Sequence, residues 1–139
     1  MADVSGPDAS GVITYREAVS EGLARELRRD PSVVCLGEDI GAAGGVFKTT
    51  DGLFAEFGPS RIWDTPISEI AIMGITMGAA MTGMRPVAEI MFSDFLACCW
   101  DYLANEMPKI RYMTGGQVKV PLVVRTANGG GLGLSLIHI

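Results

Sequence analysis

The sequence predicts an α/β fold built on a parallel β-sheet. Three short apolar runs rich in β-branched residues, at 33–36, 87–92 and 122–124, are typical of strands buried on both faces of a sheet. Segments with helical periodicity separate these runs, and such alternation favours parallel pairing with right-handed crossovers. The chain has 139 residues, of which 48% are hydrophobic and 19% charged, so it is one domain or part of a larger one and too apolar to be disordered.

The first predicted helix begins after Thr14, because Glu17 stands three residues later and completes a capping box. The Asp30-Pro31 pair ends this helix, since the residue before a proline avoids the helical conformation. One face repeats every four residues and should cover a core. This apolar face consists of Tyr15, Val19, Leu23 and Leu27.

The first strand, 33–36, is followed by Glu38 and Asp39. Acids at the carboxyl end of a buried strand stand where open α/β sheets keep their binding sites, although solvated loop acids are an equal alternative. A glycine-punctuated loop, a short helix over 53–57 and a short strand at 62–63 are expected next.

The helix after Ser68, which can serve as its N-cap, carries a stripe of small residues. Such a stripe lets a backbone or a neighbouring subunit approach closely, so this helix is expected to be buried. The stripe consists of Ala71, Gly74, Ile75, Gly78, Ala79 and Thr82.

A long third helix should run from Ser93 or Asp94 to about Tyr112. Pro108 lies inside it and should kink it near Asn105, because proline removes a helical hydrogen bond.

Glu69 is the strongest candidate for chemistry, because it opens an apolar helix directly after a predicted strand. It is either a first-turn acid favoured by the helix dipole or a buried carboxylate suited to proton exchange, and the residues alone do not decide. Glu89, inside a predicted strand, needs a partner, for which Arg85 and Arg125 are candidates, and a salt bridge is the commoner explanation.

Two further features carry weak signals. The adjacent Cys98 and Cys99 are better explained by core packing than by redox chemistry. The run Gly129–Gly133 could cradle phosphate but lacks any complete phosphate-loop pattern.

Composition excludes several other classes of protein. A net charge of −5 without a visible basic face argues against a nucleic-acid partner. The polar start of the chain contains no Lys or Arg and indicates no signal peptide, and the weakly charged run 70–84 is too short for a membrane span. Three cysteines form no disulfide framework, so we expect a reduced, cytoplasmic setting.

The two ends of the chain are expected to lie outside the domain. Residues 1–12 are predicted to be a disordered segment, and LSLIHI at 134–139 reads as the translation of a sequencing adapter. The only histidine, His138, lies in that tail and is therefore given no catalytic role. The domain is expected to cover 13–133 and to be the truncated front part of a longer chain.

Five segments together resemble one protein family. They are GEDIGAAGGVFKTTDGLFAEFGP, RIWDTPISE, GAAMTGMRPVAEIMFSDF, RYMTGGQ and VPLVVR. They resemble the beta subunit of the thiamine-diphosphate-dependent first component of 2-oxo acid dehydrogenase complexes. Within this group, their amino-acid sequence is most similar to pyruvate and acetoin dehydrogenase beta subunits. Branched-chain 2-oxo acid dehydrogenase is a further alternative.

The resemblance implies a transketolase-like pyrimidine-binding domain, doubly wound and incomplete here. It implies that Glu69 hydrogen-bonds the ring nitrogen of the cofactor's aminopyrimidine and so acts in catalysis. It also implies that Phe95 packs on that ring, that Ile67 adjoins the cofactor, and that Glu38 faces a polar tunnel between two active sites. Leu122 matches a position whose carbonyl binds a structural potassium ion.

The resemblance also implies partners. An alpha subunit would hold the diphosphate and its magnesium, because this sequence has no GDG…N motif. Two alpha and two beta chains would form the enzyme and pass an acyl group to a lipoyl-bearing second component, and the fragment alone is expected to be inactive. A non-catalytic α/β interaction domain is the alternative from a different functional class.

Overall fold

The structure, a computed structural model, describes residues 11–128 and contains a four-stranded parallel sheet. The strand order is β2-β1-β3-β4, which confirms the predicted α/β class. The strands are β1 (Val33–Gly37), β2 (Ile62–Asp64), β3 (Arg85–Phe92) and β4 (Val123–Ala127). The interpretations placed on residues 1–10 and on 129–139, including the glycine run and His138, lie outside the described residues.

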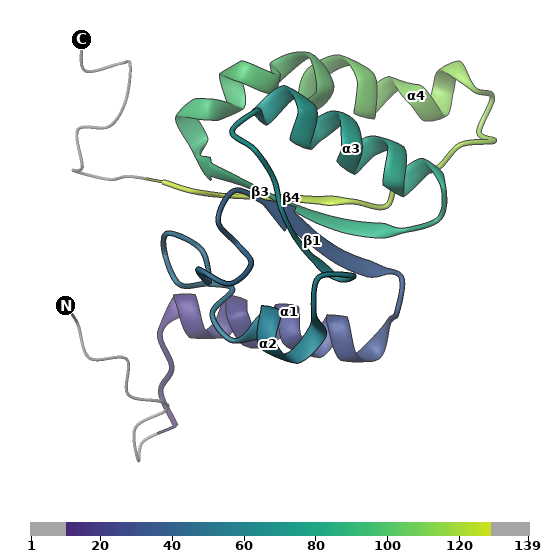
Figure 1. Cartoon of the computed structure of the whole chain (residues 1–139). Helices are drawn as coiled ribbons and strands as arrows, with labels where there is room; N and C mark the ends of the chain where they lie inside the picture. The colour runs from purple at the N-terminus through teal and green to yellow at the C-terminus, as the bar shows by residue number, and fades with distance from the viewer. Residues whose placement is uncertain (1–10, 129–139) are drawn as a thin grey trace, which may run out of the picture.

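Helices cover both faces of the sheet, as the doubly wound prediction requires (Figure 1). On one face lie α1 (Tyr15–Arg29) and α2 (Leu53–Phe57). On the other lie α3 (Glu69–Met81) and an unbroken helical segment that contains η1 (Ser93–Cys99), η2 (Tyr102–Glu106) and α4 (Met107–Met113).

Two apolar clusters hold these layers to the sheet, because successive strand residues point to opposite faces. On the α1 side, Cys35 and Leu27 are only 2% exposed. On the α3 side, Leu36, Met73 and Ala88 are fully buried. All five residues of β1 are buried, as the continuous apolar run predicts.

The capping box of α1 is confirmed. The amide of Glu17 donates to Thr14 Oγ1 at 3.2 Å, and the amide of Thr14 donates to Glu17 Oε2 at 2.6 Å. The expectation for Tyr15 is wrong, since its side chain is 88% exposed. Tyr15 occupies the first position of the helix, beyond the end of the hydrophobic cluster that Leu27 and Ala24 enter.

Within the small-residue stripe of α3, Gly74 packs closely against Tyr102, but most of the stripe faces away from the core, so the prediction of a buried helix is wrong. Larger neighbours such as Ile72, Met73 and Met77 turn inward, since they fill more space against the sheet. Within the described residues, Ala71 and Gly78 are exposed and Ile75 is 51% exposed. Ser68 does occupy the N-cap position, but its side chain makes no capping hydrogen bond.

The helical segment after β3 is irregular where Pro108 predicts it. Residues Tyr102–Glu106 form a π-helical stretch directly before α4, in which Pro108 stands in the first turn. A proline has no amide hydrogen, and a wider turn accommodates that missing hydrogen bond. Neither Ser93 nor Asp94 is the predicted N-cap, because the segment already begins at Ser93 and Phe92 occupies the N-cap position without a side-chain cap bond.

The last predicted strand forms, but it is less buried than its apolar sequence suggests. Val123 is 55% exposed, and Leu122 lies just outside the strand. β4 pairs only with β3 among the described residues, so one of its sides has no neighbour there.

Candidate active site

The fold itself marks one place for a ligand. β1 and β3 are neighbours, yet the connection after β1 runs through α2 on one face and the connection before β3 runs through α3 on the other. In open parallel sheets, the crevice beyond the carboxyl ends of two such strands is the usual binding position. The carboxyl ends of β1, β2 and β3 lead to Glu38, Glu69 and Phe95, respectively.

Glu69 is the first residue of α3 and lies five positions after β2 ends at Asp64. Its side chain is half-buried, and no hydrogen bond or ion pair holds its carboxylate within residues 11–128. The amino end of a helix favours a negative charge there. The structure therefore places a carboxylate acceptor at the crevice and leaves it available to a ligand donor.

Glu38, directly after β1, is the second acid at the crevice. Partial burial raises the pKa of its carboxyl, and the negative charges of Glu69 and Asp39 raise it further. Glu69 is thus close enough to Glu38 for the two charges to repel. Asp39 adopts a left-handed backbone conformation with φ of 55°, which turns the chain sharply away from the strand. The sheet therefore brings together two acids that are far apart in the sequence.

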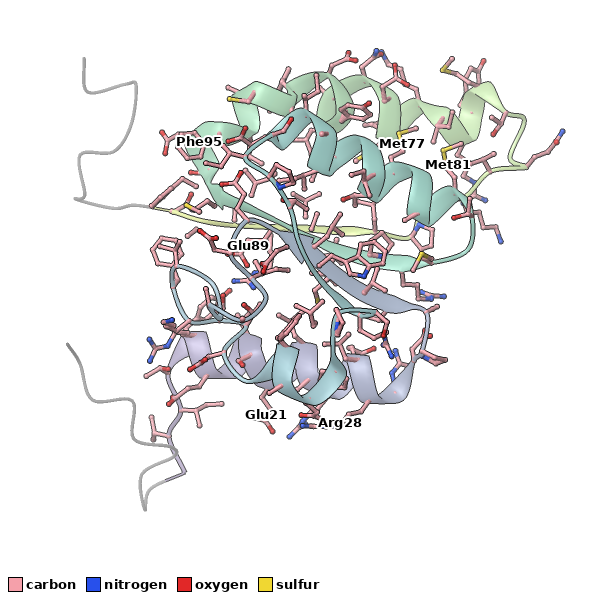
Figure 2. All side chains as sticks on the ribbon, in the orientation of Figure 1. Glu21, Arg28, Met77, Met81, Glu89 and Phe95 are labelled. Carbon is pink, nitrogen blue, oxygen red and sulfur yellow. The ribbon has the colours of Figure 1, made fainter. Side chains whose placement is uncertain are left out.

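Phe95 lies on the α3 side of the sheet, beyond the end of β3, where its side chain is labelled in Figure 2. It is 36% exposed and makes an edge-to-face contact with Phe92, with ring centroids 5.9 Å apart. Ile67 is 82% exposed, in the segment that leads from β2 to Glu69. The segments that follow β2 and β3 thus each leave an apolar side chain accessible, Ile67 and Phe95 respectively.

Leu122 is the one predicted site residue that lies elsewhere. It precedes the amino end of β4, so it belongs to the edge of the sheet opposite the carboxyl ends. Its amide donates to the carbonyl of Val120 at 2.9 Å. Among the described residues, no group of three or more His, Cys, Asp or Glu side chains is arranged to hold a metal ion.

The loop 40–50 follows β1 and is bonded to the end of β2, and sequence reasoning gave it no function. The Gly41 amide donates to Asp64 Oδ1 at 2.7 Å, which joins the end of β1 to the end of β2. A side chain at Gly41 would collide with the Asp64 carboxylate, so only glycine allows this approach. The hydroxyl oxygen of Thr65, one residue on, is buried without a hydrogen-bond partner among the described residues.

Glu89 pairs with Arg125 and not with Arg85. The two side chains come from directly paired positions of β3 and β4, and Nη1 of Arg125 lies 2.9 Å from Oε2 of Glu89. The contact is an ion pair without an aligned hydrogen bond. Arg85 lies 3.4 Å from Asp30 instead. Burial raises the pKa of the Glu89 carboxyl, and the Arg125 charge opposes that rise.

The adjacent cysteines differ in their surroundings. Cys99 is buried in the α3-side cluster, as core packing predicts, but Cys98 is exposed, so that prediction is wrong for Cys98. Burial raises the pKa of the Cys99 thiol, with smaller contributions from Cys98 and Glu69. No cysteine of the described residues forms a disulfide.

Comparison with known proteins agrees with this geometry. Residues 11–134 match the transketolase pyrimidine-binding domain. The chain is 45% identical over 127 residues to the 2-oxoisovalerate dehydrogenase subunit beta of Bacillus subtilis, covering 91% of this chain and 39% of that protein. It is 41% identical over 126 residues to the pyruvate dehydrogenase E1 component subunit beta of Staphylococcus epidermidis, with the same two coverages, 91% and 39%.

One further sequence relative and one solved structure are also similar to this chain. The chain is 44% identical to the acetoin:2,6-dichlorophenolindophenol oxidoreductase subunit beta of Bacillus subtilis, over 91% of this chain and 41% of that protein. A solved structure described as a split gene transketolase, inactive beta4 tetramer, superposes with a TM-score of 0.59 at 26% identity, over 81% of this chain and 33% of that one.

The chain belongs to the family of transketolase pyrimidine-binding domains. Within that family it is similar to the beta subunits of 2-oxo acid and acetoin dehydrogenases, which confirms the resemblance found in the sequence. The chain spans about two fifths of the length of these relatives, 39% in the case of the 2-oxoisovalerate enzyme. No helix within residues 11–128 combines the length and hydrophobicity needed to cross a bilayer.

Proposed function

We propose that this chain is the pyrimidine-binding part of the beta subunit of a 2-oxo acid dehydrogenase that acts on pyruvate. The single observation that carries the proposal is the position of Glu69 at the crevice between the ends of neighbouring parallel strands, as a half-buried carboxylate with no protein partner among the described residues. The three sequence relatives named above are beta subunits of a 2-oxoisovalerate dehydrogenase, an acetoin oxidoreductase and a pyruvate dehydrogenase E1 component. On this proposal the domain covers residues 13–133 of a longer chain.

The residues at the crevice fit the aminopyrimidine of thiamine diphosphate. The carboxylate of Glu69 would accept a hydrogen bond from a ring nitrogen that carries a proton, and such a bond strengthens as the ring gains positive character. Phe95 would offer its ring, and Ile67 its aliphatic side chain, to the faces of the heterocycle. When bound, the cofactor supplies an electron sink for loss of carbon dioxide from the 2-oxo acid.

Glu38 would be a second group at the crevice that takes up and releases protons. Its raised pKa results from partial burial and from the charges of Glu69 and Asp39, so it takes up a proton more readily than an exposed glutamate. An acid that protonates readily beside Glu69 suits a site in which protons move during each turnover. This supports the tunnel position that the sequence resemblance gives to Glu38.

Partners complete the proposed enzyme. The sequence resemblance assigns the diphosphate and its magnesium to an alpha subunit, and we propose the same division here. The exposed small-residue stripe of α3 lies next to Glu69 and allows another subunit to approach the crevice closely. We further propose that two alpha and two beta chains form the enzyme, and that it passes the acyl group to a lipoyl-bearing second component. A potassium ion would bind at the Leu122 carbonyl. We also propose a cytoplasmic setting for the three free cysteines.

A second candidate function is cleavage of acetoin, and a third is oxidation of branched-chain 2-oxo acids. Similarity to an acetoin oxidoreductase beta subunit at 44% identity and to a 2-oxoisovalerate dehydrogenase beta subunit at 45% favours each of them. Turnover of pyruvate, acetoin and 2-oxoisovalerate by the full-length subunit with its alpha partner separates the three. Faster turnover of either alternative substrate contradicts the assignment to pyruvate.

Glu69→Gln tests the proposed site, because it keeps the size of the side chain and removes its charge. We expect turnover to fall by about 10²- to 10⁴-fold, the range of a lost acid–base contribution, while the subunits still assemble. Glu26→Gln is the matched control, since Glu26 is exposed on α1 and its carboxylate pairs with Arg29 of the same helix. Unchanged turnover in Glu69→Gln rules out the proposed role and favours a non-catalytic interaction domain.

A further inference from the structure

A chain of contacts joins β4 to the aromatic ring at the crevice. Arg125 of β4 uses one guanidinium nitrogen, Nη1, for Glu89 and the other, Nη2, to donate a hydrogen bond to the hydroxyl of Thr49. Thr49 is 7% exposed and lies in the loop 40–50. A buried ion pair gives little net stability compared with apolar residues, so its value can lie in holding a particular arrangement.

The loop 40–50 is closed upon itself, so few bonds fix it to the sheet. Thr50 Oγ1 donates to the carbonyl of Ile40 at 2.8 Å, and the Gly45 amide donates to the carbonyl of Asp39 at 2.8 Å. Two side-chain hydrogen bonds attach this compact loop to the strands. One runs from the Gly41 amide to Asp64 of β2, and the other is the Arg125–Thr49 bond.

Phe47 extends from this loop to the residues that end β3. Its ring meets Phe92 edge-on, with centroids 5.3 Å apart and planes at 85°. Phe92 in turn meets Phe95 edge-on, at 5.9 Å and 88°. Edge-to-face pairs have a preferred direction, so the orientation of one ring constrains the next. Phe95 is 36% exposed, so other side chains pack on only part of its ring, and the edge-to-face contact with Phe92 helps to fix the ring orientation.

We propose that Arg125 and Thr49 are positioning residues, which hold the loop 40–50 so that Phe47 and Phe92 orient Phe95 for the aminopyrimidine of thiamine diphosphate. The inference rests on the proposed function, because it takes Phe95 as a wall of the cofactor site. Glu89 keeps the Arg125 guanidinium in place from the neighbouring strand. Apart from Phe95, none of these side chains needs to touch the cofactor for the arrangement to affect its binding.

Thr49→Val tests the inference in the full-length subunit assembled with its alpha partner. The change removes the hydroxyl acceptor and keeps the shape of the side chain. We expect the Kd for thiamine diphosphate, measured by titration with magnesium present, to rise about three- to tenfold, because part of one charged hydrogen bond is lost to positioning. Amide hydrogen exchange at Gly44 and Gly45 should quicken in the cofactor-free complex.

Two controls separate positioning from general stability. Thr49→Ser keeps the hydroxyl and should restore the Kd to within about twofold, and Thr126→Val makes the same chemical change at an exposed β4 position and should leave it unaltered. A Kd for Thr49→Val equal to that of Thr126→Val overturns the inference, even when the unfolding midpoint has shifted.

A second variant covers the case in which Thr49→Val fails to fold. Phe47→Leu removes one ring from a partly exposed position and should raise the Kd in the same direction, and a wild-type Kd in this variant then overturns the inference. Failure of the proposed function is distinguished by Glu69→Gln. Unchanged turnover there refutes the function itself, whereas lost turnover with an unchanged Kd in Thr49→Val refutes only the positioning role.

Discussion

Replacing Arg125 by methionine leaves the carboxylate of Glu89 buried without its counter-ion. Glu89 is 7% exposed and projects from β3 toward the α1 side of the sheet, where Figure 2 labels it. Its one charged partner within residues 11–128 is Arg125, whose side chain is 19% exposed. Methionine fills much of the volume of the arginine stem, so the substitution removes the charge with little change in packing.

The expected loss follows from the geometry of the pair. At 2.9 Å and an effective dielectric constant of about 20, the two charges attract each other by about 6 kcal/mol. Desolvation of the two ions costs several kcal/mol each, so the intact pair contributes little in net terms. Removing one partner leaves the desolvation cost of the other, typically about 3–5 kcal/mol, and we expect about 3 kcal/mol because Arg125 is partly solvated.

The loss should depend on pH with a definite sign. Burial raises the pKa of Glu89 in the folded protein even with Arg125 opposing it, and the variant raises it further. A carboxyl whose folded pKa exceeds its unfolded value binds more protons in the folded state, so stability falls as pH rises through that interval. The free energy of unfolding of Arg125→Met should therefore lie nearer that of wild type at pH 5 than at pH 8.

Urea unfolding at both pH values measures this difference, with the double variant Glu89→Gln, Arg125→Met as the control. The double variant has no buried charge at either position and should lose the extra pH dependence. The loss in free energy of unfolding of Arg125→Met relative to wild type should be larger at pH 8 than at pH 5. An equal loss at the two pH values, or a loss below about 1 kcal/mol at pH 8, refutes the reasoning that Glu89 and Arg125 form a buried ion pair.

Three further outcomes are expected. Thr14→Ala removes the capping box and should lower the free energy of unfolding by about 1 kcal/mol in urea titration, and an unchanged value would contradict the role of the cap. Gly37→Ala places a methyl group 2.9 Å from the carbonyl oxygen of Glu89 and should cost about 1–3 kcal/mol, whereas Gly22→Ala, in open space on α1, should add about 0.5–1 kcal/mol. A thiol reagent at pH 8 should label the exposed Cys98 quickly in the native protein. Cys35 should react only after unfolding, because burial raises the pKa of its thiol to about 11. Equal labelling rates for the two cysteines, measured by mass spectrometry, would count against this burial.

Local patterns were sufficient to predict most of the sheet. The continuous apolar run of β1 and the capping box of α1 are decided by neighbouring residues, and both are found in the structure. Glu69 could likewise be placed at a strand end from the sequence. Its nearness to Glu38 could not, because that depends on the order β2-β1-β3, which brings separate strand ends together.

The predictions that were wrong share one physical cause, because they depended on contacts between segments that are distant in the sequence. A stripe of small residues shows that something approaches closely, but not whether it belongs to the same chain, and Gly78 of α3 faces outward here. The bonds from the loop 40–50 to β2 and β4 were not predicted, because its glycines signal only a turn. Arg125 lies 76 positions after Thr49 in the sequence, and only the folded chain brings their side chains together.

The register of the central ladder has a consequence for synthesis of the chain on the ribosome. β1 pairs along its whole length with β3, Val33 lying opposite Arg85 and Gly37 opposite Glu89. The most buried strand therefore has to wait, through the emergence of α2, β2 and α3, until its main partner leaves the exit tunnel. During that interval the β1 side chains that face α3, such as Leu36, lack their covering layer, and transiently exposed apolar surface of this kind is what chaperones bind.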